Sequence, residues 1–587
     1  MVFTEDRTAP VVETDTDAGS ATPPAGIPHI RAAGRPRRWY LHPPRLVLVA
    51  TVTFVALTGF WSVLTPLTEA PDEPAHLGLV LRVADTGRYP AYDGLVHTKG
   101  LFQLCMDYAA SAKWCATKAE RDAEVGVRPH PAAAAPPKDQ RAHWDDADFQ
   151  EIEPGRLNQM PQHPPVYYLA MAEALRVERA VVPGDHSVDQ ELAFLRMLNV
   201  LLVLPLPYLA WLLVRRLGGG DELGILAALV PLGVPQLTHI GATLNNDNLF
   251  VVVVSWLMAL LAGVARGDRT RRTMVLVGLA LGLALLTKGF GVVLPPVVVL
   301  AYWVGTPAAP ATESNRRLVG WLRRGWAATP AALGALVIGF VLSGWWYLNN
   351  LRRTGRIMPS IEDARLNVRN RLVDYSPTVW EYVSSTVSRL VEGFWGSFGW
   401  RRVMLPPMVS TVATLTCLFL MYVAIRRAPR SSADPEQPLT RARLGILILP
   451  VVALGAFVII RAAVIYQDTG RLAFQQGRYL FAGLTATSAV VALGIRHLCG
   501  RRALTVTLVG VVVLQGLAIV WCIRGWWRAD GLLGLGPFRE IVAWSGLPDL
   551  VVVAVLVWLP LQLLILVRAS LRSSGADDGS MADLVEA

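Results

Sequence analysis

Long apolar runs separated by short basic segments constrain this chain more than any other feature. The first run spans 46–67 and the last spans 550–568. A helix needs about 20 apolar residues to cross the ~30 Å hydrocarbon core of a bilayer. Charged residues make up only 17% of the 587 residues, against about 25% in soluble proteins, and the mean hydropathy is +0.40. The sequence therefore predicts an all-α polytopic membrane protein.

The positions of arginine predict how the spans are oriented. The net charge of +10 comes largely from short basic loops such as Arg215-Arg216 and Arg501-Arg502, which is the positive-inside pattern of membrane proteins and not the signature of a nucleic-acid partner. The predicted spans are 46–67, 192–214, 222–240, 248–265, two short spans within 273–305, 327–348, 404–425, 444–464, 480–497, 503–522 and 550–568. About twelve spans place both termini in the cytoplasm.

The spans define the expected domains. Residues 1–44 predict a disordered cytoplasmic tail, 45–568 the transmembrane domain, and 569–587 a cytoplasmic C-terminal tail. Two large loops, 68–191 and 349–403, fall on the extracytoplasmic side.

The first of these loops carries two further predictions. We expect 164–181 to be an amphipathic helix lying along the interface, because counting it as a span would invert the predicted orientation of every later span. Cys105 and Cys115 are candidates for a disulfide in an oxidising compartment, and two free thiols are the alternative.

Two acids and a histidine follow the first span directly, in Pro71-Asp72-Glu73-Pro74-Ala75-His76. We call this segment, 71–76, the acidic corner. Its prolines restrict the backbone, and a general base must be held within reach of the group it deprotonates. On a helix beginning near Glu73, His76 shares a face with the acids and would orient a carboxylate or help to bind a divalent metal. Simple polarity at a membrane interface is the alternative.

The predicted orientation places further polar residues on the same side as the acidic corner. A charge in an apolar region is expensive and usually functional, and arginine suits phosphate recognition. Snorkelling of Lys288 and contacts of the loop arginines with anionic headgroups are the alternatives. The candidates are His163 and Tyr167, Asn245 and Asp247, Lys288, Arg352 and Arg353 with Arg356, Arg365, Arg369 and Arg371, and Arg478 with Tyr479.

Together these motifs resemble the bacterial membrane-protein family called domain of unknown function 2142 over most of 45–525. The family commonly has a proline shortly after its Gly-Arg-Tyr motif, where this chain has Leu480-Phe481-Ala482. More broadly, the layout is similar to the GT-C superfamily of integral glycosyltransferases, which includes protein O-mannosyltransferases and lipid A aminoarabinose transferases. The similar features are the acidic pair, the His163-Pro164-Pro165 motif, and Gly282-Leu283-Ala284 followed by Thr287-Lys288-Gly289.

The resemblance implies inverting sugar transfer from a polyprenyl-phosphate donor to a cell-envelope glycan, lipid or protein, outside the plasma membrane. Asp72 is then the base, supported by Glu73 or His76. Lys288, Arg478, Arg352 and Arg353 are expected to bind the donor phosphate, and His163, Tyr167, Asn245, Asp247 and Tyr479 the substrates. No cofactor is required, although a divalent metal stays open. The alternatives are a flippase of lipid-linked sugars and a non-catalytic partner in envelope glycan assembly.

Overall fold

The computed structural model describes residues 42–101, 104, 137–141, 143–144, 157–182, 184, 186–306, 317–361, 378–399, 401–430, 439–469, 472–527 and 534–582, with the backbone alone at 317–324, 468–469 and 573–582. The chain divides into two units, Met1–His42 and Pro43–Ala587, and all the elements below lie in the second. The predictions for the tail before residue 42, for Cys105 and Cys115, and for Arg365, Arg369 and Arg371 fall outside the described residues.

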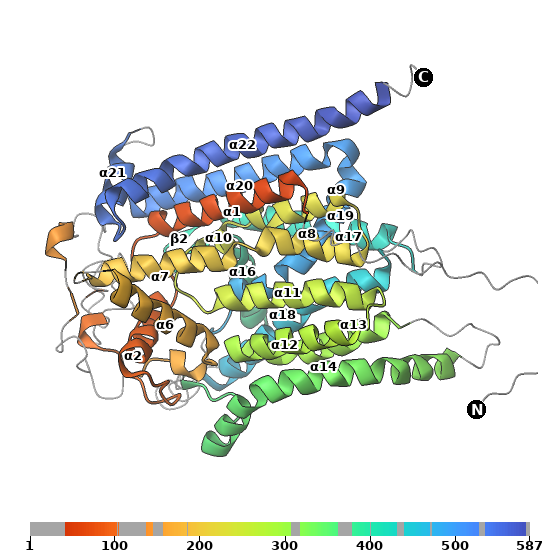
Figure 1. The fold of residues 1–587 in the computed structure, drawn as a ribbon, viewed down its shortest axis with the longest axis horizontal. Coiled ribbons are helices and arrows are strands. Elements are labelled where there is room, and N and C mark those ends of the chain that lie inside the picture. The colour runs from red at the N-terminus through yellow and green to blue at the C-terminus, as the bar shows by residue number, and fades with distance from the viewer. Residues whose placement is uncertain are drawn as a thin grey trace, which may run out of the picture. The chain divides into compact units, whose positions relative to one another are not determined.

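Helices dominate the described residues (Figure 1). In chain order they are α1 (Arg45–Leu64), α2 (Glu73–Thr86), η3 (Lys138–Gln140), η5 (Met160–Gln162), α6 (Val166–Val181), α7 (Val188–Val203), α8 (Leu206–Leu217), α9 (Asp221–Leu229), η6 (Val230–Gly233), α10 (Pro235–Gly241), α11 (Asp247–Ala265), α12 (Arg271–Thr287), η7 (Gly289–Val293), α13 (Leu294–Val304), α14 (Arg317–Thr354), α16 (Val379–Trp395), α17 (Pro407–Arg427), α18 (Arg441–Thr469), η9 (Gly477–Gly483), α19 (Leu484–Cys499), η10 (Gly500–Arg502), α20 (Ala503–Trp526), α21 (Gly536–Trp544) and α22 (Asp549–Ala582). The strands β1 (Ser397–Phe398) and β2 (Val403–Met404) form a short antiparallel hairpin.

The predicted class is confirmed, whereas the count of twelve spans is not. By length and composition, eight helical segments in the described ranges are suited to cross a membrane, and nine if the pair Asp221–Gly233 and Pro235–Gly241, bent by 73°, is one span. One of the eight, Gly477–Trp526, is 50 residues long and covers two predicted spans. At about 1.5 Å per residue it exceeds one bilayer thickness more than twofold. The predicted hairpin within 273–305 is helical too, but α12 has only 17 residues.

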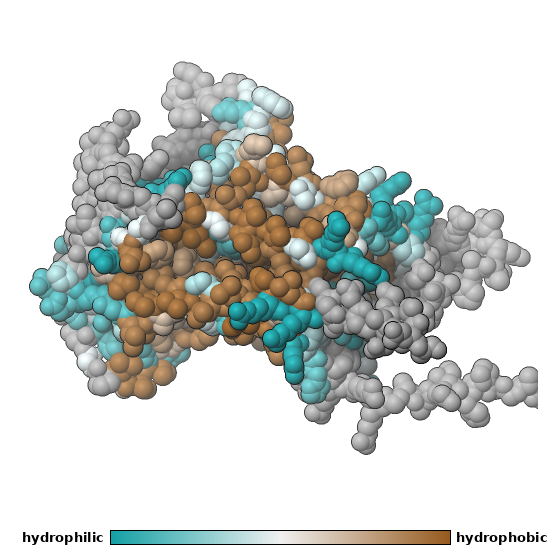
Figure 2. Space-filling view, turned by 90° about the horizontal axis from the view of Figure 1, so that it is seen from above, coloured by the Kyte–Doolittle hydropathy of each residue, from teal (hydrophilic) through white to brown (hydrophobic). Residues whose placement is uncertain are grey.

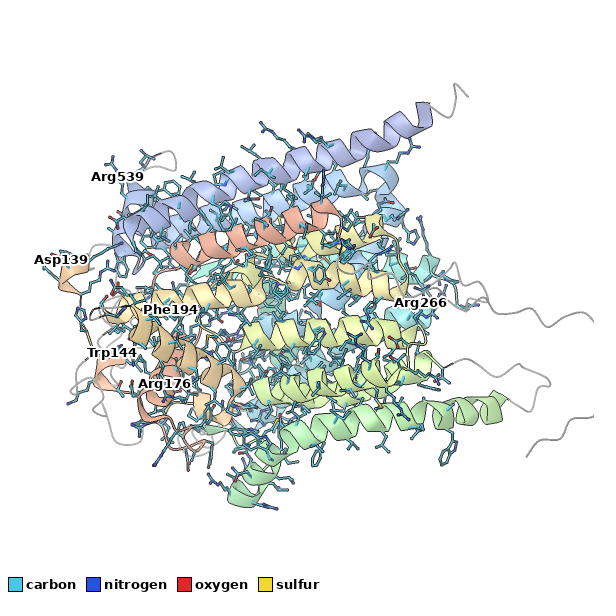
Figure 3. All side chains as sticks on the ribbon, viewed as in Figure 1. Asp139, Trp144, Arg176, Phe194, Arg266 and Arg539 are labelled. Atoms are coloured by element: carbon cyan, nitrogen blue, oxygen red, sulfur yellow. The ribbon has the colours of Figure 1, made fainter. Side chains whose placement is uncertain are left out.

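Helices α2 and α6 lie together at one end of the bundle, on the left of Figure 1. The Arg176 guanidinium of α6 donates to the Ala84 carbonyl oxygen of α2 at 2.6 Å. Neither helix is among the segments suited to span a membrane, and the position of 164–181 along an interface stays a prediction. Figure 3 places Arg176 at this end and Arg266, from a predicted basic loop, at the other. The first polar loop and that basic loop therefore lie at opposite ends of the helices.

A broad apolar surface covers much of the face shown in Figure 2, with hydrophilic residues gathered toward its ends. Helix α17 exposes Met408 and Leu415, and α22 exposes Leu550 and Leu564. Exposed apolar patches this extensive are rare on soluble monomers. The surface is therefore suited to lipid contact, as the composition predicts.

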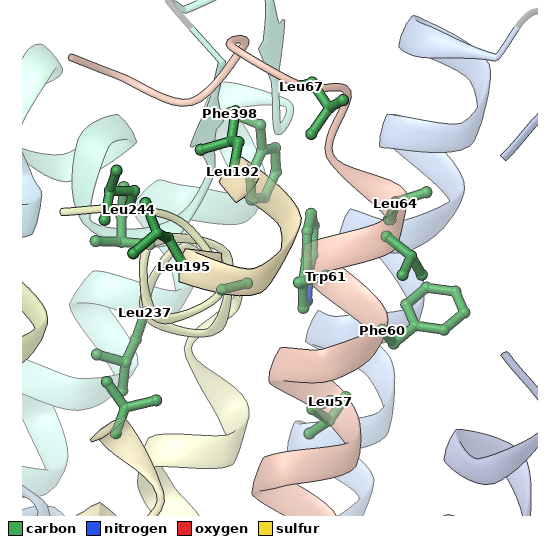
Figure 4. Close-up of a cluster of buried hydrophobic side chains, with 14 of the residues drawn as sticks. Leu57, Phe60, Trp61, Leu64, Leu67, Leu192, Leu195, Leu237, Leu244 and Phe398 are labelled. Carbon is green, nitrogen blue, oxygen red and sulfur yellow. The ribbon is translucent and has the colours of Figure 1, made fainter. Parts of the chain in front are cut away.

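A buried cluster around Trp61 connects α1 to the β1–β2 hairpin (Figure 4). The Trp61 ring stacks on Phe398 with 4.9 Å between centroids, and its indole N–H donates to Gln515 Oε1 at 3.0 Å. The Gln236 amide of α10 exchanges two hydrogen bonds with the Ser397 backbone, at 2.9 and 3.0 Å. Because the indole N–H and the hairpin backbone both have hydrogen-bond partners, the cluster fixes the β1–β2 hairpin against α1 and α10.

Helix α16 packs directly on the backbone of η9 through two glycines. A methyl group on Gly393 would lie 2.7 Å from the Gly477 amide nitrogen. One on Gly477 would overlap the Leu390 carbonyl oxygen and the Phe394 amide nitrogen. The contact therefore holds Arg478, the next residue, at a set distance from α16.

We expect Gly477→Ala to destabilise the protein by about 1–3 kcal/mol, because backbone atoms of α16 occupy the space that the new methyl group needs. The measurement is the unfolding temperature of the purified protein in detergent. Gly510→Ala is the matched control, since a methyl group on Gly510 would meet no atom of another segment within 4 Å and alanine favours a helix. An unfolding temperature of Gly477→Ala equal to that of the wild type would contradict the proposed close contact.

Candidate active site

A cavity of about 340 Å³ lies where the acidic corner meets η9 and α16. Its volume falls within the range of about 300–1,000 Å³ that is usual for small-molecule sites. The lining residues come from six segments that are far apart in the sequence, 71–76, 159–163, 236–246, 288–290, 389–401 and 472–479. The fold therefore assembles, in one place, most of the residue types that the sequence singled out.

Asp72 presents its carboxylate to this cavity. Its backbone is left-handed, with φ at 66°, a conformation that aspartate tolerates better than most residues. It stands at the N-cap of α2 but does not cap that helix with its side chain. Instead, Asp72 Oδ2 accepts a hydrogen bond from Arg478 Nη2 at 2.6 Å. The carboxylate is thus held by one strong contact while part of it faces the cavity.

Arg478 joins Asp72 to a second ion pair. Its Nε lies 3.6 Å from Asp247 Oδ2, and its Nη1 donates to the Pro71 carbonyl oxygen at 3.3 Å. Lys288 forms an ion pair with Asp247 Oδ1. Two carboxylates and two cations thus meet in a largely buried site, where charges without partners would be costly. The four side chains together carry no net charge.

Aromatic rings cover the cationic side of the network. The Lys288 ammonium lies 4.9 Å from the Phe290 ring centroid and 4.8 Å from that of Tyr479. The Arg478 guanidinium carbon is 5.6 Å from the Tyr479 centroid. Ring faces attract cations and exclude water. The two cations are therefore fixed in direction and poorly hydrated, which strengthens their attraction for an entering anion.

Two histidines on the cavity wall are neutral near neutral pH. His76 Nδ1 is 2.9 Å from the Tyr168 hydroxyl, and the Tyr89 hydroxyl donates to the His163 carbonyl oxygen at 2.8 Å. Burial, together with neighbouring positive charges, lowers the pKa of His76 well below its ordinary value. Burial, followed by the charge of Lys288, lowers the pKa of His163 to about 3. Both rings can therefore exchange hydrogen bonds with a ligand without adding charge.

Glu73 lies away from the cavity, contrary to its expected place beside Asp72 at the site. It is fully buried. Arg196 forms a two-pronged ion pair with it, at 2.8 and 2.5 Å. The backbone N–H groups of Thr68 and Leu244 each donate to it at 3.1 Å. Four donors leave this carboxylate no capacity for a substrate, so we reassign Glu73 from chemistry to positioning.

Arg196 is a residue that the sequence analysis missed. Its remaining donors bind the carbonyl oxygens of Ser62, Thr65 and Pro66, at 3.1, 2.8 and 3.0 Å. The guanidinium therefore holds the end of α1 and the entry to the acidic corner together. A lone arginine inside the apolar run 192–214 was the available signal.

The structure brings together most, but not all, of the predicted site residues. Those that line the cavity are Asp72, His76, His163, Asn245, Lys288, Arg478 and Tyr479, and Asp247 contacts two of them. Tyr167 is buried behind the wall, where its hydroxyl donates to Asn199 Oδ1 at 2.9 Å.

Arg352 and Arg353 are exposed at the end of α14 and do not line the cavity. A role of these two arginines in phosphate binding therefore has no support from their positions. Arg389, Arg401 and Phe290 line the cavity without having been singled out.

The donor set does not fit a divalent metal. Within the described ranges, no three His, Cys, Asp or Glu side chains lie close enough to hold a metal ion. Asp72 and Asp247 are paired with cations, and His76 is bonded to a tyrosine hydroxyl through Nδ1.

We expect Glu73→Gln to cost about 3–5 kcal/mol of stability, because it leaves the buried Arg196 without its counter-charge. The readouts are the yield of folded protein and its unfolding temperature. Glu173→Gln is the matched control, since Glu173 forms only an exposed ion pair with Arg176, typically worth less than about 1 kcal/mol. Equal stability of the two variants would show that the Glu73 pair has no anchoring role.

Acidification is expected to destabilise the protein partly through His163. Its folded-state pKa lies below the unfolded value of about 6.5, so the unfolded chain takes up the proton first. The contribution of the neutral His163 ring to the free energy of unfolding is complete above about pH 6.5 and is lost as the pH falls toward 3. Because the ring faces a cavity, we expect a loss of about 1–2 kcal/mol between pH 7 and pH 5.

Unfolding temperatures across this pH range test that expectation. His163→Gln should show a shallower pH dependence than the wild type, whereas replacement of the exposed His42 (His42→Gln) should not alter it. Identical pH profiles for all three proteins would refute the assignment.

Solved structures of other proteins are similar to this chain. ArnT from Cupriavidus metallidurans, in crystals bound to undecaprenyl phosphate and in the apo state, has 16% sequence identity and a TM-score of 0.46, over 90% of this chain and 73% of that one. The archaeal oligosaccharyltransferase AglB from Archaeoglobus fulgidus, in complex with an inhibitory peptide and a dolichol-phosphate, has 12% identity and a TM-score of 0.36, over 91% of this chain and 56% of that one. At these scores neither likeness assigns an activity.

No curated protein matches the chain. The family described as "Predicted membrane protein (DUF2142)" matches residues 55–486, which is well over half of the 587 residues. That match includes the acidic corner, Lys288 and Arg478. The protein therefore belongs to the DUF2142 family of predicted membrane proteins.

Proposed function

We propose that the protein is a GT-C-type inverting glycosyltransferase that moves a sugar from a polyprenyl-phosphate donor to a cell-envelope acceptor. One observation carries the proposal: a partly accessible carboxylate, Asp72, shares a cavity with two buried cations, Arg478 and Lys288. A base beside an anion site is what transfer of a sugar from a phosphate requires. The motif resemblance described above supports the same reaction.

The groups in the cavity account for the proton, the new bond and the leaving group of this reaction. Asp72 accepts the proton of the acceptor's hydroxyl group, and the oxygen of that hydroxyl attacks the anomeric carbon of the donor sugar. The bond from that carbon to the phosphate oxygen breaks on the opposite face, which inverts the configuration. The polyprenyl phosphate leaves with the bonding electrons, and Arg478 and Lys288 stabilise its negative charge.

Because Arg478 forms an ion pair with Asp72, the carboxylate becomes available as a base only when the donor binds. Before the donor arrives, the guanidinium occupies Asp72 Oδ2. A phosphate oxygen competes for the same guanidinium, because arginine binds phosphate and carboxylate with the same fork of donors. Displacement frees the carboxylate for the acceptor hydroxyl.

The protein acts, on this proposal, in the plasma membrane, with both termini cytoplasmic and the cavity on the extracytoplasmic side. Asn245 and Asn246 on the cavity wall supply amide groups suited to sugar hydroxyls. The acceptor is an envelope glycan, lipid or protein.

A flippase of lipid-linked sugars is the second candidate, and the bent pair Asp221–Gly233 and Pro235–Gly241 favours it. Transporters build their sites from such interrupted helices. Gln236, just after the bend, lines the cavity.

The test is transfer from a pool of radiolabelled polyprenyl-phosphate sugars to envelope extract by the purified protein in proteoliposomes. We expect Asp72→Asn to reduce transfer about 10²–10⁴-fold, the usual contribution of a general base. Asp93→Asn is the matched control, because Asp93 is exposed and outside the cavity, and it should retain full activity.

Two results would overturn the proposal. The first is full transfer by folded Asp72→Asn. The second is wild-type protein that moves labelled lipid across the bilayer without attaching the sugar to any acceptor, which would establish the flippase.

A further inference from the structure

The cavity lining carries more positive charge than its carboxylates neutralise. Lys288 is paired with Asp247 and Arg478 with Asp72. The four cations among the described lining residues are Lys288, Arg389, Arg401 and Arg478.

The other two cations, Arg401 and Arg389, differ in how they are bound. Arg401 Nη2 lies 3.0 Å from Glu392 Oε2. Arg389 donates to the Leu472 carbonyl oxygen at 2.9 Å, and no carboxylate in the described parts of the chain forms an ion pair with it.

Arg389 and Arg401 both line the cavity, from two different elements. Arg389 lies on α16, one turn before Gly393, which also lines the cavity, and Arg401 lies in the turn between β1 and β2. Burial and then the positive charge of Arg401 lower the pKa of Arg389, and the negative charge of Glu392 opposes this shift. Arg401 also has a left-handed backbone, with φ at 65°, a conformation that is strained outside glycine. The fold therefore presents two guanidinium groups to one cavity, and among the described residues only Arg401 forms an ion pair with a carboxylate.

A buried acceptor without a partner lies on the same wall. The Gln475 side-chain nitrogen donates to Thr386 Oγ1 at 2.7 Å, which fixes the amide. Its oxygen, Oε1, has no hydrogen-bond partner in the described structure, although only 4% of the residue is exposed. Buried acceptors are almost always satisfied. A ligand hydroxyl beside the anion would satisfy this one.

We propose that Arg389 and Arg401 form a second anion subsite, distinct from Arg478 and Lys288, that binds a phosphate or carboxylate next to a hydroxyl. The inference rests on the proposed function, because it takes the first subsite to hold the donor's phosphate. Two sources have this chemistry: the second phosphate of a diphosphate-linked donor, and an anionic group on the acceptor.

The test measures binding to the full chain in nanodiscs with three probes, farnesyl phosphate, farnesyl diphosphate and glycerol 3-phosphate. The variants are Arg389→Gln, Arg401→Gln and their combination, each checked for an unchanged unfolding temperature. Arg88→Gln is the matched control, because Arg88 is exposed and outside the cavity. Arg478→Gln reports on the first subsite. Binding is measured without turnover, so an inactive enzyme and an absent subsite are distinguishable.

We expect the double variant to bind the second anion about tenfold to a hundredfold more weakly, because charge-assisted hydrogen bonds are lost. Its affinity for farnesyl phosphate should stay within about twofold of that of the wild type. If the donor supplies the anion, the wild type binds the diphosphate about tenfold or more tightly than the monophosphate, and the variant abolishes that difference. If the acceptor supplies it, both lipids bind alike, and glycerol 3-phosphate binds the wild type saturated with farnesyl phosphate but not the variant.

Two outcomes would overturn the second subsite. One is that the arginine variants bind all three probes as the wild type does. The other is that they weaken farnesyl phosphate as much as Arg478→Gln does, which would make Arg389 and Arg401 part of a single anion site.

Discussion

The buried ion pair between Glu73 and Arg196 is the interaction on which the rest of the site depends. The guanidinium binds the carboxylate and three backbone carbonyl oxygens at the end of α1, and the carboxylate also accepts from the backbone before α11. In a poorly solvated interior, neither charge tolerates the loss of its partner. One pair thus joins α1, α2, α7 and the segment before α11 around a single point. Asp72, one residue away, takes its position from that junction.

The adjacent acids Asp72 and Glu73 have different surroundings because the backbone turns between them. Asp72 is left-handed, and Glu73 begins α2, so their side chains leave the chain in different directions. Glu73 points into the protein and is saturated by four donors, whereas Asp72 points to the cavity and accepts from Arg478. A short segment therefore supplies both a rigid anchor and an accessible carboxylate. This arrangement meets the requirement that a general base be held in place.

Charge balance governs what the cavity can accept. Asp72, Asp247, Lys288 and Arg478 neutralise one another, so an anion must displace a carboxylate from a cation to bind there. On the proposed function, this competition couples capture of the donor phosphate to release of the base. In the described parts of the chain Arg389 forms no ion pair with a carboxylate, whereas Arg401, the other member of the proposed second subsite, is paired with Glu392. An anion that binds at the second subsite therefore competes with a carboxylate at Arg401 but not at Arg389.

The sequence alone predicted the all-helical membrane class and singled out the acidic corner, Lys288 and Arg478 as site candidates, because charges beside long apolar runs are costly and few. It did not separate the roles of Asp72 and Glu73, since spacing alone does not reveal a left-handed residue. Nor did it identify Arg196 or Arg389, or separate Arg352 from the cavity. Whether an arginine meets a carboxylate, a carbonyl group or water is decided by segments hundreds of residues apart, and only their packing in the tertiary structure brings them together.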